Sequence, residues 1–138
     1  MENNCYFVCS RGILKSCTFH SSKPLSSCNN DFKYLYDMLK SNKMFNGMSI
    51  YICSDLLRFF VNKIFPYLTH MFVLVSGDSD MCVPKEALSK EETLTLLKSK
   101  LLINWYTQNS RVEGNSKIIQ MPIGLDYHTI LRLSLIHI

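Results

Sequence analysis

The fold is decided by one stretch of the chain, Met71-Phe72-Val73-Leu74-Val75-Ser76-Gly77-Asp78-Ser79-Asp80. Its first five residues are all apolar and include two β-branched valines, a pattern typical of a strand that is buried on both faces. Gly77 then permits a sharp turn, and two carboxylates follow at i and i+2. Because α/β folds bind their ligands at the carboxyl ends of parallel strands, we expect a site at this turn.

The size and composition of the chain indicate one folded domain. It has 138 residues, of which 47% are hydrophobic and 19% are charged, and its net charge is +4. This is enough apolar material for a core, and we assign residues 1–132 to a single domain. The lysines are scattered, so no dedicated nucleic-acid groove is expected, although the charge is compatible with small anionic ligands.

The sequence favours a reducing, cytoplasmic location. We find no signal peptide at the start of the chain and no apolar run near the roughly 18 residues that a membrane helix needs. The six cysteines lack the paired C-x-x-C spacing of a zinc site. We therefore expect reduced cysteines in the core and loops, with disulfides or metal binding as the less favoured alternative.

Strands and helices are expected to alternate along the chain. Residues 6–9 and 13–19 are predicted to form a small N-terminal β-hairpin, and a helix capped by Asn30 or Asp31 is predicted to run to Lys43. Further strands are expected at residues 48–53, 71–75, 101–106 and 117–123. Two more helices are expected, one capped by Ser54 and ended by Pro66, and one that starts with a capping box of Ser89 and Glu92. This order predicts a three-layer Rossmann-like α/β domain with a mainly parallel sheet.

The last six residues, Leu133-Ser134-Leu135-Ile136-His137-Ile138, look like the read-through of a sequencing adapter at the end of a metagenomic gene fragment. On this interpretation the native chain continues differently after Arg132, and the domain is truncated at its C-terminus. The alternative is a natural apolar tail.

Polar residues follow the strands at positions that share one sheet edge. We predict Asp126 and His128 as catalytic residues, with Asp126 orienting the imidazole for proton transfer. The predicted substrate-binding residues are Ser76, Gly77, Asp78, Asp80, Gln108, Asn109, Gly124 and Tyr127. Their convergence from distant parts of the chain is the main functional argument.

Asp78 and Asp80 form a D-x-D pair that is suited to one divalent cation, Mn²⁺ or Mg²⁺. The alternative is that both carboxylates cap backbone amides in a tight turn. Trp105 and Tyr106 suit stacking on a base or a sugar ring, but an aromatic pair in a strand is more often part of the core.

Three blocks of the chain resemble the exostosin-like glycosyltransferases and related proteins of large DNA viruses and algae. The blocks are Val73-Leu74-Val75-Ser76-Gly77-Asp78-Ser79-Asp80, Asn104-Trp105-Tyr106-Thr107-Gln108-Asn109 and Lys117-Ile118-Ile119-Gln120-Met121-Pro122-Ile123-Gly124-Leu125-Asp126. The resemblance covers about residues 48–129.

The resemblance implies a domain that transfers a sugar from a nucleotide-sugar donor. In such two-domain enzymes the donor lies between the halves, often without a metal, which conflicts with a metal at Asp78 and Asp80. It also implies that the chain needs a missing C-terminal part of the same gene product, and that this fragment is inactive alone. Gln108 and Asn109 would bind the sugar.

Two other functions fit the residues. Asp55, Asp78, Asp80 and Asp126 could serve a metal-dependent phosphoesterase or nuclease. The chain could instead be a non-catalytic module that binds a nucleotide or a carbohydrate.

Overall fold

A four-stranded, all-parallel sheet organises the molecule. The computed structural model describes residues 10–22, 32–111, 114 and 117–122. The strands are β1 (Met48–Cys53), β2 (Phe72–Gly77), β3 (Leu102–Thr107) and β4 (Ile118–Gln120). Their spatial order is β1-β2-β3-β4, and each neighbouring pair is parallel. The predicted α/β class and parallel sheet are therefore confirmed, and all four carboxyl ends lie at one edge.

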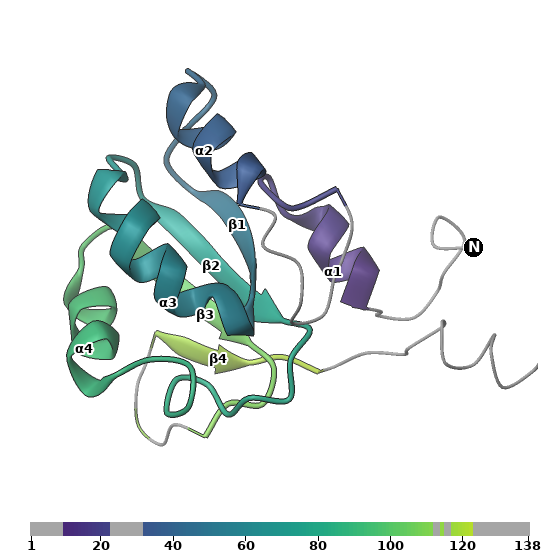
Figure 1. Ribbon diagram of the computed structural model, residues 1–138, viewed down its shortest axis with the longest axis vertical. Helices are drawn as coiled ribbons and strands as arrows, with labels where there is room; N and C mark the ends of the chain where they lie inside the picture. Colours follow the sequence, from purple (N-terminus) through teal and green to yellow (C-terminus); the bar gives the residue numbers. More distant parts are fainter. Residues whose placement is uncertain (1–9, 23–31, 112–113, 115–116, 123–138) are drawn as a thin grey trace, which may run out of the picture.

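The two faces of the sheet are covered by different helices. One face packs against α2 (Lys33–Lys40), α4 (Lys90–Lys98) and the helical segment between β1 and β2. The other face packs against the short helix α1 (Ser10–Ser16), where Leu14 and Cys17 contact Tyr51 and Val75. In Figure 1, α3 and α4 lie on the left of the strands and α1 lies on the right. The domain therefore has three layers.

An irregularity in β3 sets which side chains enter the core. Phe72 pairs with Leu102 and Leu74 pairs with Trp105, so β3 contains one residue more than β2 over this interval. Such a bulge shifts the alternation of side chains by one position. As a result Leu102 and Trp105 both point toward the sheet face that α2 and α4 cover, although they are three residues apart.

The segment between β1 and β2 changes helix type along its length. It comprises a 3-10 turn (Ser54–Leu56), α3 (Leu57–Phe59), a π turn (Phe60–Ile64) and a 3-10 turn (Phe65–Tyr67). Two details differ from the sequence prediction. The Ser54 side chain does not cap the helix, because Ser54 is the first residue of the 3-10 turn and its hydroxyl has no hydrogen-bond partner among the described residues. Pro66 lies inside the last turn, where a proline near the start is tolerated, and the segment ends at Tyr67.

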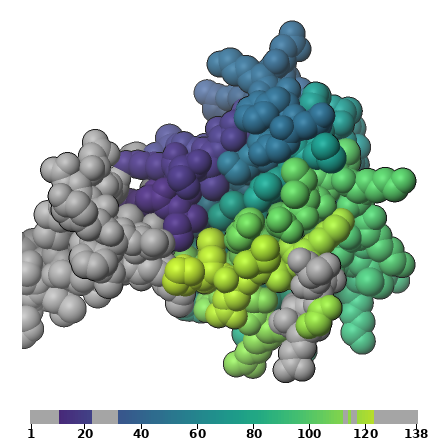
Figure 2. All heavy atoms as spheres, turned by 180° about the vertical axis from the view of Figure 1, so that it is seen from behind, coloured from purple at the N-terminus to yellow at the C-terminus, as the bar shows by residue number. Residues whose placement is uncertain are grey.

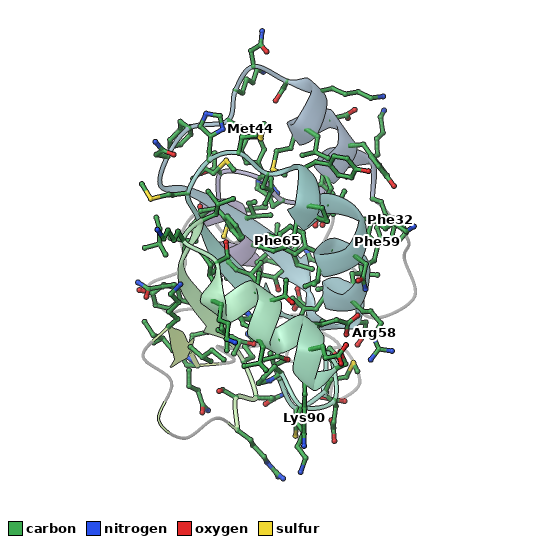
Figure 3. The ribbon with its side chains drawn as sticks, turned by 90° about the vertical axis from the view of Figure 1, so that its left-hand side faces the viewer. Phe32, Met44, Arg58, Phe59, Phe65 and Lys90 are labelled. Carbon is green, nitrogen blue, oxygen red and sulfur yellow. The ribbon has the colours of Figure 1, made fainter. Side chains whose placement is uncertain are left out.

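The capping box before α4 is confirmed. The Ser89 hydroxyl accepts a hydrogen bond from the Glu92 amide, and the Glu92 carboxylate accepts one from the Ser89 amide. Glu92 also contacts Arg58 and Asn62 of the neighbouring helical segment. These bonds keep the pKa of Glu92 below its ordinary value, the Ser89 amide having the largest effect. Figure 3 shows Arg58 directed toward the α4 side of the molecule.

The predicted N-terminal hairpin is wrong where the structure tests it. Residues 10–16 form α1, and the predicted first strand, residues 6–9, lies outside the described residues. Leu14 lies in α1 and Cys17 directly follows it, and both pack on the sheet. Only Phe19 keeps a strand-like contact, a parallel bridge to Ile50 of β1.

The remaining elements follow the sequence closely. Helix α2 is shorter than predicted and ends at Lys40, and its N-cap is Phe32, so the predicted cap by Asn30 or Asp31 is wrong. The aromatic rings of Phe32 and Phe59 stack at 3.7 Å between centroids and join α2 to α3 (Figure 3). None of the helices formed by the described residues is long and apolar enough to cross a membrane. Cys17, Cys53 and Cys82 are in the thiol form and make no disulfide.

Candidate functional site

The carboxyl edge of the sheet brings three loops into one hydrogen-bonded cluster. The loops follow β1, β2 and β3, and their strands end in register, with Cys53 opposite Gly77 and Ser76 opposite Thr107. This register places Asp78 between the ends of β1 and β3. The predicted convergence of distant polar residues is therefore present for the part of the edge that the structure describes.

Asp78 is the centre of this cluster. Its backbone adopts the left-handed conformation, with φ of 56°, which aspartate tolerates better than most residues. The Tyr51 hydroxyl donates a 2.5 Å hydrogen bond to its Oδ2, and its backbone amide donates a 3.1 Å bond to Gln108 Oε1. The Cys53 thiol lies 3.6 Å from its carbonyl oxygen. Tyr51 of β1 thus orients the Asp78 carboxylate, and Gln108, directly after β3, holds the Asp78 backbone.

Tyr51 is held in its protonated form. Its side chain is 3% exposed and lies on the α1 face of β1. Burial, followed by the nearby Asp78 carboxylate, raises the pKa of Tyr51 above its ordinary value. A protonated phenol can donate to a carboxylate, whereas a phenolate would repel it. The Tyr51–Asp78 bond therefore persists to high pH.

This shift predicts a stability loss at alkaline pH that depends on Tyr51. The unfolded phenol loses its proton near pH 10 while the folded one keeps it, so stability is full below that pH and falls above it. Above pH 10 the free energy of unfolding should fall by about 1.4 kcal/mol per pH unit more in the wild type than in Tyr51→Phe. Urea titrations at several pH values measure this difference. Tyr67→Phe, which removes an exposed hydroxyl, is the control and should follow the wild type; parallel curves for Tyr51→Phe would contradict the assignment.

Gly77 is required by close packing at this point. A Cβ added to it would lie 2.7 Å from Gln108 Oε1 and 3.0 Å from the Tyr51 hydroxyl oxygen. Both of these side chains are buried. The absence of a side chain at Gly77 is what lets Tyr51 and Gln108 reach the turn that follows β2.

The loop after β2 is joined to the loops on either side. The Ser79 hydroxyl donates a 2.5 Å hydrogen bond to Asp55 Oδ1, in the 3-10 turn after β1. Asn109 Nδ2 donates a 3.0 Å bond to the Ser79 carbonyl from the loop after β3. Asn109, with a φ of 53°, adopts the same left-handed backbone conformation as Asp78. Ser79 and Asp55 thus belong to the cluster, together with Asn109.

Ser76 lies beneath the cluster in the core. Its hydroxyl accepts a hydrogen bond from Trp105 Nε1 at 2.9 Å and donates one to Thr107 Oγ1 at 2.7 Å. The Thr107 hydroxyl in turn donates to the Gln108 carbonyl. All four residues are buried. Trp105 is therefore a core residue, as the more frequent role of strand aromatics indicates, and Ser76 supports the edge from below.

The two carboxylates of the D-x-D pair have different surroundings. Asp78 is partly buried and bonded to Tyr51, whereas Asp80 is exposed. Across the described ranges, no three His, Cys, Asp or Glu side chains are grouped closely enough to hold a metal ion. The metal role of Asp78 and Asp80 stays a prediction.

Four predicted site residues, Gly124, Asp126, Tyr127 and His128, lie outside the described residues. Tyr51 was missed by the sequence reasoning. It lies inside an apolar strand, and its contact with Asp78 depends on the register between β1 and β2, which the sequence does not reveal. Its one detectable signal is a polar hydroxyl in an otherwise buried strand.

Comparisons of the chain with protein-family profiles, with curated proteins and with solved structures found no match.

Proposed function

We propose that this chain is a glycosyltransferase-like domain that binds a nucleotide-sugar donor at the carboxyl edge of its sheet. The observation that carries the proposal is the cluster centred on Asp78, which joins the loops after β1, β2 and β3. The resemblance of residues 48–129 to exostosin-like glycosyltransferases supplies the reaction class.

The chemistry of the edge suits a polyhydroxylated ligand. Carboxylates accept hydrogen bonds from sugar and ribose hydroxyls, and amide side chains both donate and accept. Asp80 is exposed and Asp78 is partly buried, so both can be reached from solvent. Asp78 is also held in place before a ligand arrives, which reduces the entropy lost on binding.

The roles within the proposed site differ by residue. Asp78 and Asp80 would contact the sugar or the donor ribose, and Asn109 would bind a sugar hydroxyl. Gln108 is 4% exposed and accepts from the Asp78 amide, so it would act by holding the loop that carries Asp78. Asp126 and His128 stay the proposed catalytic pair, and Gly124 and Tyr127 stay proposed substrate contacts.

A thermal-shift panel tests the proposal. A nucleoside diphosphate sugar at about 100 times its Kd should stabilise the folded chain by roughly 2.7 kcal/mol, which corresponds to a rise of several degrees in Tm. Asp80→Asn should remove at least half of this rise and leave the ligand-free Tm unchanged within about 1 °C, since the side chain is exposed. Asp37→Asn, an exposed aspartate on α2, is the matched control. No shift with any nucleotide sugar, in this chain or in a longer gene product, contradicts the proposal.

A metal-dependent phosphoesterase is the second candidate. Its motivation is the Ser79–Asp55 hydrogen bond, which ties the Asp55 carboxylate to the loop of Asp78 and Asp80. A bound metal would have to draw these carboxylates closer, since no three such side chains are grouped for a metal among the described residues. A Tm rise with Mn²⁺ alone, together with hydrolysis of a phosphodiester that Asp80→Asn abolishes, would favour this candidate. Nucleotide or carbohydrate binding without turnover in the longer gene product would indicate a binding module.

A further inference from the structure

The opposite edge of the sheet carries a surface that the proposed function does not use. Three exposed apolar or aromatic side chains precede the strands: Phe45 in the loop before β1, Tyr67 at the end of the 3-10 turn before β2, and Met71 directly before β2. Their exposed fractions are 51%, 68% and 42%. These are three of the seven large hydrophobic side chains that are exposed among the described residues. They belong to loops that meet at one edge.

Backbone hydrogen bonds hold these loops together. The Met71 amide donates to Asn46 Oδ1, and the Gly47 amide donates to the Met71 carbonyl. The Phe72 amide donates to the Leu101 carbonyl, which joins the start of β2 to the segment before β3. The amino edge is therefore as well defined as the carboxyl edge.

The charged side chains of the loops at this edge are lysines, and the nearest carboxylate in the sequence is that of Asp37, in the last turn of α2. Lys43 and Lys100 are exposed in the loops before β1 and β3. The segments 41–50, 66–73 and 98–104 contain no aspartate and no glutamate. The carboxylates of the described cluster all lie at the other edge of the sheet, so the length of the strands separates them from Lys43 and Lys100.

The placement of labelled residues agrees with this polarity. In Figure 3, Met44 of the loop before β1 lies toward the top, whereas Arg58 and Lys90 lie toward the bottom. In Figure 1 the loop that follows α2 reaches the upper end of the molecule. The loop before β1 therefore lies at the end of the domain opposite Arg58 and Lys90.

We propose that this amino edge, defined by Phe45, Tyr67, Met71, Lys43 and Lys100, docks on an anionic lipid bilayer. Lysines bind acidic headgroups, while exposed aromatic and thioether side chains enter the interfacial region of the bilayer. A second copy of the chain is disfavoured as the occupant, because two such edges would repel each other. Docking by this edge leaves the carboxyl edge facing the solvent.

Vesicle co-sedimentation with the full chain tests the proposal. The chain should partition onto vesicles of phosphatidylcholine with about 30% phosphatidylserine and not onto pure phosphatidylcholine vesicles, and added salt should weaken the binding. Because each lysine contributes about fivefold, Lys43→Ala with Lys100→Ala should weaken the partition roughly thirtyfold. Lys85→Ala with Lys90→Ala is the matched control, since both lysines are exposed near the other edge. Equal losses in the two pairs would overturn the proposal.

The apolar contribution is tested separately. Tyr67→Ser should reduce partition at least tenfold, whereas Leu94→Ser, at an exposed leucine on α4, should leave it unchanged. Unchanged circular dichroism and Tm confirm that each variant folds. Absence of partition onto acidic vesicles overturns the proposal. So does binding of a single-stranded oligonucleotide that Tyr67→Ser abolishes while vesicle partition is unaffected.

Discussion

Gly77→Ala is expected to lower the free energy of unfolding by about 1–3 kcal/mol, the usual cost of overpacking a filled site. The new Cβ would meet Gln108 Oε1 at 2.7 Å and the Tyr51 hydroxyl oxygen at 3.0 Å. Neither side chain can move into solvent without losing its bond to Asp78. The substitution should therefore also reduce any ligand-induced shift in Tm. Urea unfolding followed by circular dichroism measures the first effect.

A double-mutant cycle shows whether the cost arises at Gln108. Combining Gly77→Ala with Gln108→Ala should cost less than the sum of the two single variants, by about 0.5–3 kcal/mol, because the clash is removed. Additive costs would contradict the proposed packing. The comparison does not depend on which ligand the edge binds.

Trp105→Ala is expected to cost about 3–5 kcal/mol, as large-to-small substitutions of buried aromatic residues do. Trp105 is fully buried and donates its indole N–H to Ser76. Trp105→Phe should cost less, because it keeps most of the apolar contact and loses mainly this hydrogen bond. Circular dichroism must report the unfolding, because the chain has one tryptophan. A cost below about 1 kcal/mol for Trp105→Ala would contradict its place in the core.

The sequence predicts the strands well because their signals are local. The apolar run before Gly77 is a strand, and the Ser89–Glu92 capping box starts α4 as expected. Strand and capping signals depend on residues within a few positions of one another. The capping box holds because both partners lie in the same turn.

The features that were missed depend on long-range packing. Residues 13–16 were predicted to begin a strand, but they lie in helix α1, which packs through Leu14 against Tyr51 and Val75. Serine is a common capping residue, but the Ser54 hydroxyl is buried without a hydrogen-bond partner among the described residues. Tyr51 reaches Asp78 because β1 and β2 pair in one particular register.

Part of the candidate site could be predicted from the sequence alone. Asp78 and Asn109 were identified as edge residues because each lies in the polar loop that follows a predicted strand. Their hydrogen-bond partners could not be inferred, because Tyr51 precedes Asp78 by 27 residues and Ser79 precedes Asn109 by 30. Figure 2 shows the α1 face, where α1 lies beside the end of β4, a contact that likewise joins distant segments.

The strand order β1-β2-β3-β4 also bears on how the chain folds. Among the described residues, each strand pairs with the strands that precede and follow it in the sequence, so the sheet can be built in sequence order. Each pairing still spans a crossover connection, and parallel pairings of this kind form more slowly than local helical contacts. During synthesis, β1 and β2 can join as soon as both have left the ribosome, and β3 and β4 can then add to the exposed edge one at a time.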